Sequence, residues 1–402
     1  MDLLLITNLY PPQELGGFGR CMADFCWGLM QRGHRLQVIS SDAPYLGPSS
    51  HGPSGEPVNR CLTLKGTFEG GMRFLGDRPK CLSIDHDNQK LIKHWLGLKE
   101  WDGILVGNLE MLGPELLLPL VSQGCSVLHH VGFITPPYPA ELQPIHANYL
   151  PVAASRCVRK SLVASGFNHQ PIPVVYPGAR VGLFETSLTT NALPPKPLGT
   201  AASPLKVCFA GILMSTKGVQ TLADAIVILH RQGIRVQANF AGKPYQKGLQ
   251  QLLSANMAEG GLEENYFFGE LSRTQLARFL RIHHVLVFPS IYPEAFGIVA
   301  AEAMASGLAL VSSGVGGASE LFEDGVSGLR FEPGNAPHLA QQLKRLLDEP
   351  GLLEKLQSVG KARVHERFSV THSAQQLENL FMHYGKGDAA STKAPSLGSV
   401  IF

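Results

Sequence analysis

Short apolar segments typical of β-strands alternate with helix-like segments in both halves of this 402-residue chain. Strands and helices that alternate in this way form parallel sheets with helices on both faces, so the pattern predicts an α/β fold with doubly wound sheets. In the first half, the expected strands are 3–7, 36–40, 104–106, 126–129 and 171–176, and the expected helices are 18–32 and 155–166. In the second half, the expected strands are 206–211, 236–242, 285–290, 308–313 and 328–333, and the expected helices are 219–232, 271–282, 337–347 and 369–385.

A proline-rich stretch separates the two halves. It contains four prolines and few apolar residues, as interdomain linkers do. The chain is also long for a single hydrophobic core, so two Rossmann-like domains are expected. The predicted units are a domain at 1–184, the linker at 185–204, a second domain at 205–368, a helix at 369–385 and a loose tail at 386–402.

Composition narrows the functional class. The net charge of +2 gives no reason to expect a nucleic-acid partner. Seven scattered cysteines without a CxxC pair fit buried thiols in a reducing cytoplasm. The opening MDLLLITNLYPP predicts a core strand rather than a signal peptide, and no apolar run is long enough to suggest a membrane span.

Two glutamates flank the start of an expected helix in SIYPEAFGIVAAEAMASG. The strand at 285–290 leads through a short turn to a helix that opens near Gly297, with Glu294 before it and Glu302 about one and a half turns inside. The first turn of a helix presents unpaired N–H groups that bind anions. Glu302 lies among small apolar residues, where an unpaired carboxylate is costly. The spacing fits an acid/base couple, or two groups that grip hydroxyls on either side of a phosphate.

Three other segments lie where an expected strand ends. Lys217 in AGILMSTKG is placed at the carboxyl edge of a sheet, where a lysine can pair with a diphosphate; a solvated loop lysine is the alternative. The glycines at 16–19 let backbone approach a phosphate or a sugar. A further glycine loop at 314–317 adds a third segment to the same rim.

Two other interpretations of the motifs are weaker. The glycines at 16–19, with Asp42 as the ribose acid, suggest a dinucleotide site, but the third small residue is missing and the loop is long. Asp85-His86-Asp87 has the spacing of a metal site in some transferases. Residues 43–94 look irregular, however, so a helix cap before NQKLIKHWL is expected there and no metal. The basic and aromatic residues of 60–99 fit either a solvated loop or contact with anionic lipid or an acidic acceptor.

Together these residues resemble glycosyltransferase family 4, the retaining GT-B glycosyltransferases of the glycosyl transferases group 1. The resemblance runs from YPPQELGGFGR through YPGAR to the glutamate segment, VGGASELFEDGVSG and the final helix. It implies two Rossmann-like domains that face a central cleft, the first for the acceptor and the second for the nucleotide sugar. It also implies that the helix at 369–385 crosses back to the first domain.

The resemblance further implies roles for individual residues. Glu294 would hydrogen-bond the donor sugar, Lys217 would neutralise the diphosphate, and His130 would contact the sugar, with His129 as the alternative in the HH doublet. Glu302 would grip the ribose. The other donor-binding residues would be Gly17, Gly269, Leu271, Phe296, Gly297 and Ile298.

The implied reaction needs no metal and no cofactor apart from the nucleotide-sugar co-substrate, which is a UDP-, GDP- or ADP-sugar. The acceptor is a hydroxyl on a saccharide, a lipid-linked compound or a small molecule, and the product has an α-glycosidic bond. The expected location is the cytoplasm, with peripheral contact at the inner membrane face through 60–99 as one interpretation.

One position departs from the family pattern. The family usually has Arg where this chain has Ile212, so a cation beside Lys217 is missing. Arg20 or Lys243 is a candidate substitute. The change leaves open a protein that binds or epimerises sugar nucleotides without transfer, while an NAD-dependent oxidoreductase is the more distant alternative.

Overall fold

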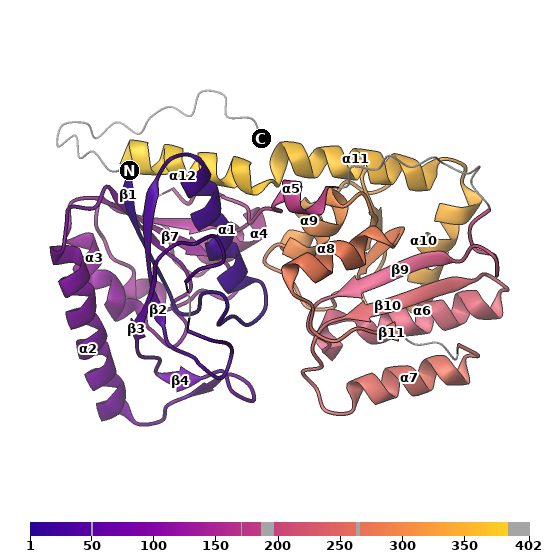
Figure 1. The fold of residues 1–402 in the computed structure, drawn as a ribbon, viewed down its shortest axis with the longest axis horizontal. Coiled ribbons are helices and arrows are strands. Elements are labelled where there is room, and N and C mark those ends of the chain that lie inside the picture. Colours follow the sequence, from indigo (N-terminus) through magenta and orange to yellow (C-terminus); the bar gives the residue numbers. More distant parts are fainter. Residues whose placement is uncertain (50, 170, 186–196, 263–265, 385–402) are drawn as a thin grey trace.

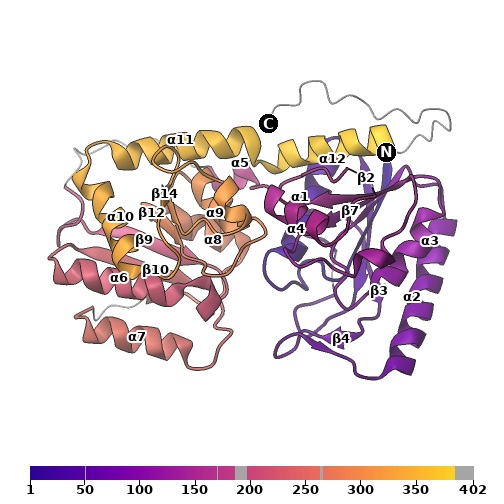
Figure 2. The ribbon, with the colours of Figure 1, turned by 180° about the vertical axis from the view of Figure 1, so that it is seen from behind.

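The computed structural model describes residues 1–49, 51–169, 171–185, 197–262 and 266–384. These residues form two lobes side by side, and a helical segment runs along one edge of both (Figure 1). The same arrangement seen from behind shows that each lobe has helices on both faces of its sheet (Figure 2). Part of the expected linker, 186–196, and the expected tail, 386–402, lie outside the described residues.

The N-terminal lobe contains a six-stranded parallel sheet in the order β3-β2-β1-β6-β7-β8. The chain order reverses at β1, and ligands of open α/β sheets bind outside the carboxyl ends of the strands at such a point. The inner strands are buried on both faces because helices cover both. The strands are β1 (Asp2–Thr7), β2 (Arg35–Ser41), β3 (Val58–Leu62), β6 (Gly103–Val106), β7 (Ser126–Val131) and β8 (Tyr149–Ala153).

The helices of this lobe are α1 (Phe18–Gln31), α2 (Arg78–Gly97), α3 (Leu118–Val121) and α4 (Arg156–Ala164), with a small hairpin of β4 (Gly66–Thr67) and β5 (Arg73–Phe74). The short helix α5 (Val181–Phe184) comes next in the chain and packs on the C-terminal lobe. Two expectations were wrong here. The segment 43–94, expected to be irregular, contains β3 and most of α2. The segment 171–176, expected to be a strand, makes only an isolated bridge between Val174 and Ala153.

Helix α2 was missed because its apolar stripe is thin: Ile84, Ile92 and Leu96 are buried among many charged neighbours. Its N-cap is Asp77, whose carboxylate accepts from the backbone N–H of Lys80 at 3.0 Å. Asp85-His86-Asp87 therefore lies inside the helix and does not cap it. Asp85 forms an ion pair with Lys65 at 2.7 Å.

The C-terminal lobe repeats the architecture with the strand order β11-β10-β9-β12-β13-β14, again wholly parallel. The strands are β9 (Leu205–Ala210), β10 (Val236–Ala241), β11 (Tyr266–Phe267), β12 (Val285–Phe288), β13 (Ala309–Ser312) and β14 (Leu329–Arg330). The helices are α6 (Val219–Arg231), α7 (Leu249–Glu259), α8 (Arg273–Arg281), α9 (Ile298–Ala305), α10 (Ala336–Asp348) and α11 (Leu352–Arg367). The expected α/β fold with doubly wound sheets is thus present in both lobes.

The final helix, α12 (Val370–Tyr384), packs on the N-terminal lobe although α11 packs on the C-terminal one. Leu377 and Phe381 belong to the same core as α1. Gly28 of α1 permits the close approach, because a Cβ there would lie 2.8 Å from that of Ala374. The chain passes between the lobes beside Ala179, whose N–H donates to the carbonyl of Phe368 at 2.8 Å.

Candidate functional site

The segment with the two glutamates leads from β12 into α9. Glu294 lies in the turn, and Glu302 lies in the second turn of the helix. Gly297 is the N-cap residue with φ of 110°, a conformation that favours glycine. No described side chain caps α9, so its first backbone N–H groups remain available to an anion.

Glu294 is held by residues of its own lobe. The Lys217 Nζ donates to Glu294 Oε1 at 2.6 Å, and the hydroxyl of Ser290 donates to the same oxygen. In the described part of the chain, no hydrogen bond reaches Glu294 Oε2. The side chain of Lys217 is 31% exposed and that of Glu294 is 15% exposed, so a ligand can reach both. The structure therefore brings these two predicted residues together.

Glu302 is fully buried and is held by arginines from both lobes. Arg273 of α8 donates to Glu302 Oε1 at 3.2 Å, and Arg20 of α1 lies 3.8 Å from Oε2. Oε2 has no hydrogen-bond partner among the described residues. Burial raises the pKa of Glu302, while Arg273 and Arg20 act in the opposite direction. Oε2 is buried and retains the capacity to accept one more hydrogen bond.

Asp24 and Arg273, which no sequence motif singled out, complete this cluster. Asp24 of α1 is 1% exposed and accepts hydrogen bonds from both terminal nitrogens of Arg273, one of them at 2.7 Å. Arg180 lies 3.8 Å from the same carboxylate. Burial raises the pKa of Asp24, and Arg273 lowers it. Because α1 and α8 belong to different lobes, this pair ties the lobes together.

Signals for both residues were present in the sequence. Asp24 interrupts the apolar run CMADFCWGLM, which is the same kind of misfit that singled out Glu302. Arg273 follows Ser272 in S-R-T-Q, which forms a capping box with Gln275. The capping box predicts that Arg273 opens a helix at the carboxyl edge of the sheet, where ligands bind.

Both glycine loops adjoin the glutamate segment. A Cβ on Gly17 would lie 3.3 Å from Cδ1 of Ile298, so this loop of the N-terminal lobe meets the start of α9. On the other side, the N–H of Glu294 donates to the carbonyl of Val315 at 3.3 Å, and that of Gly317 donates to the carbonyl of Glu294 at 2.6 Å. The expected rim of loops is therefore continuous in the structure.

The remaining predicted donor-binding residues offer backbone rather than side chains. Phe296 is 3% exposed and packs against Tyr176 and Phe368, so only its peptide groups can face a ligand. The carbonyl of Gly269 accepts from the N–H of Gly242 at 2.6 Å. Leu271 is half-buried and precedes the capping box of α8, two residues before Arg273.

The two histidines lie on opposite faces of β7 and are both 1% exposed. His129 bonds the hydroxyl of Tyr149 at 2.8 Å. His130 lies edge-on against Phe25 of α1 and bonds the carbonyl of Val175 through Nε2 at 2.9 Å. Burial lowers the pKa of His129 to about 3 and that of His130 to about 4, so both are neutral at pH 7. His130 Nδ1 has no hydrogen-bond partner in the described part of the chain, and its sugar contact stays a prediction.

The place of the missing family arginine is occupied by an apolar contact. A Cβ on Gly16 would lie 3.9 Å from Cδ1 of Ile212. Arg20 is paired with Glu302 and Glu14, and so lies at the Glu302 end of the segment. Lys243 is exposed. Among the described residues, no contact places Arg20 or Lys243, the candidate substitutes for that arginine, beside Lys217. Across the same residues, no group of three or more His, Cys, Asp or Glu side chains could hold a metal ion.

A model of the family Glycosyl transferases group 1 matches residues 195–363. An uncharacterized glycosyltransferase of Methanocaldococcus jannaschii is 27% identical over 399 residues, which cover 95% of this chain and 98% of that protein. The chain matches the glycosyl transferases group 1 family over most of its second half and is similar to a glycosyltransferase over nearly its whole length. It is therefore a glycosyltransferase, as the resemblance of its motifs indicated.

Solved structures show the fold of this glycosyltransferase. A glycosyltransferase from Rickettsia africae has a TM-score of 0.76 at 18% identity, with 95% of this chain and 98% of that one covered. The Anabaena HepE protein in complex with UDP and glucose has a TM-score of 0.70 at 18% identity, with 95% and 99% covered. The predicted GT-B arrangement of two Rossmann-like domains is confirmed. Among the helices of the described residues, none has both the length and the hydrophobicity of a membrane span.

Proposed function

We propose that this glycosyltransferase is a retaining enzyme that moves a sugar from a nucleotide-sugar donor to an acceptor hydroxyl and forms an α-glycosidic bond. The arrangement of Glu294 and Glu302 around the start of α9 carries the proposal. Each carboxylate is held through Oε1 by a cation and keeps an Oε2 to which no described residue donates a hydrogen bond. Two such oxygens on either side of an uncapped helix start suit hydroxyls on both sides of a diphosphate.

In this proposal, the donor lies along the segment. Glu294 binds the hydroxyls of the transferred sugar, and Glu302 binds the ribose. The backbone of 296–298, with Gly17 opposite, receives the phosphates, and backbone near Gly269 and Leu271 contacts the base. The Anabaena HepE structure contains UDP and glucose, which supports a nucleotide-sugar donor, and a UDP-, GDP- or ADP-sugar is proposed.

The transfer breaks the bond between the anomeric carbon and the diphosphate oxygen. The acceptor oxygen bonds to the same carbon from the same face, and its proton passes to the departing phosphate oxygen. Lys217 and the N-terminus of α9 stabilise the negative charge that develops on the leaving group. Glu294 positions the sugar and His130 contacts it, while contact between the lobes excludes water.

Three further features belong to the proposal. The reaction uses no metal and no cofactor beyond the donor, and it takes place in the cytoplasm. Peripheral contact with the inner membrane face would use the surface of 60–99, where Met72, Phe74 and Leu82 are at least half exposed.

A donor panel followed by product analysis tests this function. UDP-, GDP- and ADP-sugars are compared by thermal shift, and one of them should raise the melting temperature of this protein. With the selected donor, NMR of the product should show an α-anomeric linkage, with the reaction unaffected by EDTA. No shift with any donor, or a β-linked product, would contradict the proposal.

A second candidate rests on Ile212. Without the usual cation beside Lys217, the site could bind or epimerise a sugar nucleotide without transferring the sugar. Release of free nucleoside diphosphate that depends on an acceptor separates the two functions, because a binder or an epimerase releases none.

A further inference from the structure

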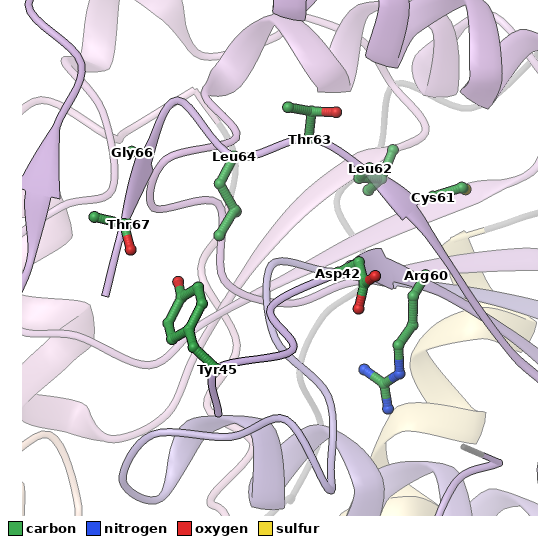
Figure 3. Close-up of a pocket in the computed structure, with 9 residues that line it drawn as sticks. All are labelled: Asp42, Tyr45, Arg60, Cys61, Leu62, Thr63, Leu64, Gly66 and Thr67. Carbon is green, nitrogen blue, oxygen red and sulfur yellow. The ribbon is translucent and has the colours of Figure 1, made fainter. Parts of the chain in front are cut away.

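A cavity of about 310 Å³ opens at the carboxyl edge of β2 and β3, away from the glutamate segment (Figure 3). Asp42 follows β2 directly, and Leu64 lies two residues beyond β3. Arg60 of β3, Tyr45 and Thr67 also line it, together with Cys61, Leu62, Thr63 and Gly66. Ligands of open parallel sheets bind at this edge, so the location is one where a substrate is expected.

The walls of this cavity are tied to the glycine loop that meets α9. Arg60 donates through its two terminal nitrogens to the carbonyls of Tyr10 and Pro11, each at 2.9 Å. Gln13 donates to Asp42 Oδ1 at 2.8 Å. Four residues later in the same loop, Gly17 lies against Ile298. One short loop therefore separates the cavity from the proposed donor site.

The exposed groups of the cavity suit a sugar ring. Tyr45 is 41% exposed, and its hydroxyl oxygen is fixed by the N–H of Phe68 at 3.0 Å, so its ring is presented in one orientation. Leu64 adds apolar surface, and Thr67 supplies a hydroxyl that points toward Tyr45 (Figure 3). Asp42 is exposed, and both of its hydrogen bonds from described residues go to Oδ1, which leaves Oδ2 to accept from a ligand. An aromatic face beside hydrogen-bonding oxygens matches a pyranose, which has an apolar C–H face and a hydroxyl rim.

The charges of the cavity select against an anionic ligand. The terminal nitrogens of Arg60 already donate to backbone carbonyls of the loop, and its Nε, which has no described partner, is buried. The carboxylate of Asp42 would repel an anionic ligand. The volume lies at the small end of the range for ligand pockets, which is roughly 300–1,000 Å³ and accommodates a terminal sugar rather than a long chain.

We infer that this cavity binds an uncharged terminal sugar of the acceptor. The inference rests on the proposed function, because the cavity serves the transfer only if a nucleotide sugar binds on the other side of the glycine loop. It assigns the acceptor to neutral saccharides among the acceptor classes that the family uses.

Saturation-transfer NMR tests the inference without the need for turnover. The probes are the methyl α-glycosides of glucose, mannose and galactose, with glucose-6-phosphate as the charged counterpart. The proteins are the wild type, Asp42→Asn, Tyr45→Ala and, as a matched control, Asp348→Asn at an exposed position of α10. The expected result is that at least one methyl glycoside binds to the wild type and the control, and that it binds more tightly than glucose-6-phosphate. Each cavity variant should weaken that binding roughly fivefold or more while it keeps the wild-type melting temperature.

Three results would overturn the inference: no bound glycoside, tighter binding of the phosphorylated sugar, or unchanged binding in both cavity variants. A parallel titration with UDP-, GDP- and ADP-sugars keeps the two proposals apart. Lys217→Ala should weaken donor binding and leave the glycoside signal intact. Loss of donor binding in all proteins with glycoside binding retained would refute the proposed transfer and support the cavity as a saccharide site. The reverse result would refute only the cavity.

Discussion

Glu294 takes its cation from its own domain, whereas Glu302 takes its cations from both. Lys217 and Ser290, which hold Glu294, follow strands of the C-terminal sheet. Glu302 is bonded by Arg273 of the same domain and faces Arg20 of the other. The first carboxylate is partly exposed and the second is fully buried. The difference indicates that the sugar end of the site forms locally, while the ribose end depends on contact between the domains.

The largest expected effect comes from breaking the contacts between the domains at the Glu302 end of the site. Arg273→Ala leaves Asp24 and Glu302 buried with weaker compensation, which should lower the free energy of unfolding by about 3–5 kcal/mol. Denaturant unfolding measures the change. Arg278→Ala, at an exposed position of the same helix, should change stability by no more than about 0.5 kcal/mol. A variant as stable as the wild type would show that Arg20 and Arg180 suffice.

Glu110 sharpens the comparison because, unlike Glu294 and Glu302, its carboxylate is buried without a cation among the described residues. Burial raises the pKa of Glu110 from 4.5 to about 7, and no described cation pairs with it. The folded state therefore binds this proton more tightly than the unfolded state. The stability it contributes is complete below about pH 4.5 and falls as the pH rises toward 7, by up to about 3 kcal/mol. Unfolding of Glu110→Gln at about pH 5 and about pH 8 should lack this decline.

The control for that experiment is Glu141→Gln, an exposed position of the same domain. It should retain the wild-type pH dependence. An equal decline in Glu110→Gln would assign the pH dependence to other groups.

The next largest effect is on the transfer rate and concerns the Glu294 end of the site, which forms within one domain. Lys217→Ala and Glu294→Ala should each lower transfer at least about tenfold, equivalent to about 1.4 kcal/mol, because each removes a group that faces the sugar or the developing charge. Steady-state transfer rates measure the loss, and the melting temperatures should stay close to that of the wild type. Lys344→Ala, which breaks an exposed ion pair on α10, is the control and should transfer at the wild-type rate. Near-normal turnover in either site variant would refute its assigned role.

The smallest expected effect comes from a substitution that restores the arginine of the family pattern near Lys217. Ile212→Arg places a second cation near Lys217 and the glycine loop, where Ile212 lies against Gly16. A partly exposed charge is worth up to about 1 kcal/mol, so transfer should rise by up to about fivefold. Comparison of kcat/KM between the two proteins measures it, with Ile212→Gln as the uncharged control. A decrease in Ile212→Arg alone would mean that this enzyme stabilises the diphosphate without a cation at 212.

Much of the fold could be predicted because strong local patterns specify it. The strands before Gly17, Lys217 and Glu294 are mainly apolar and buried, and the helices that follow them begin at glycines, so the loops that carry these residues were predicted correctly. Helix α2 was not predicted because few of its residues are buried. The segment 171–176 was predicted to be a strand, but its apolar residues pack in a loop without pairing as a strand. Local periodicity does not distinguish these cases, since both depend on what packs against the segment.

The sequence by itself determined the two-domain α/β architecture and the loops that carry Lys217, Glu294 and the start of α9. These follow from alternation, glycine positions and the cost of a carboxylate among apolar residues, which are all local properties. Only the tertiary structure decided that Lys217 and Glu294 are in contact, that Asp24 and Arg273 join the domains beside Glu302, and that a cavity with Asp42 and Tyr45 lies behind the glycine loop. Those contacts connect residues that are far apart in the chain, and their energies depend on distance and burial, which the order of residues does not specify.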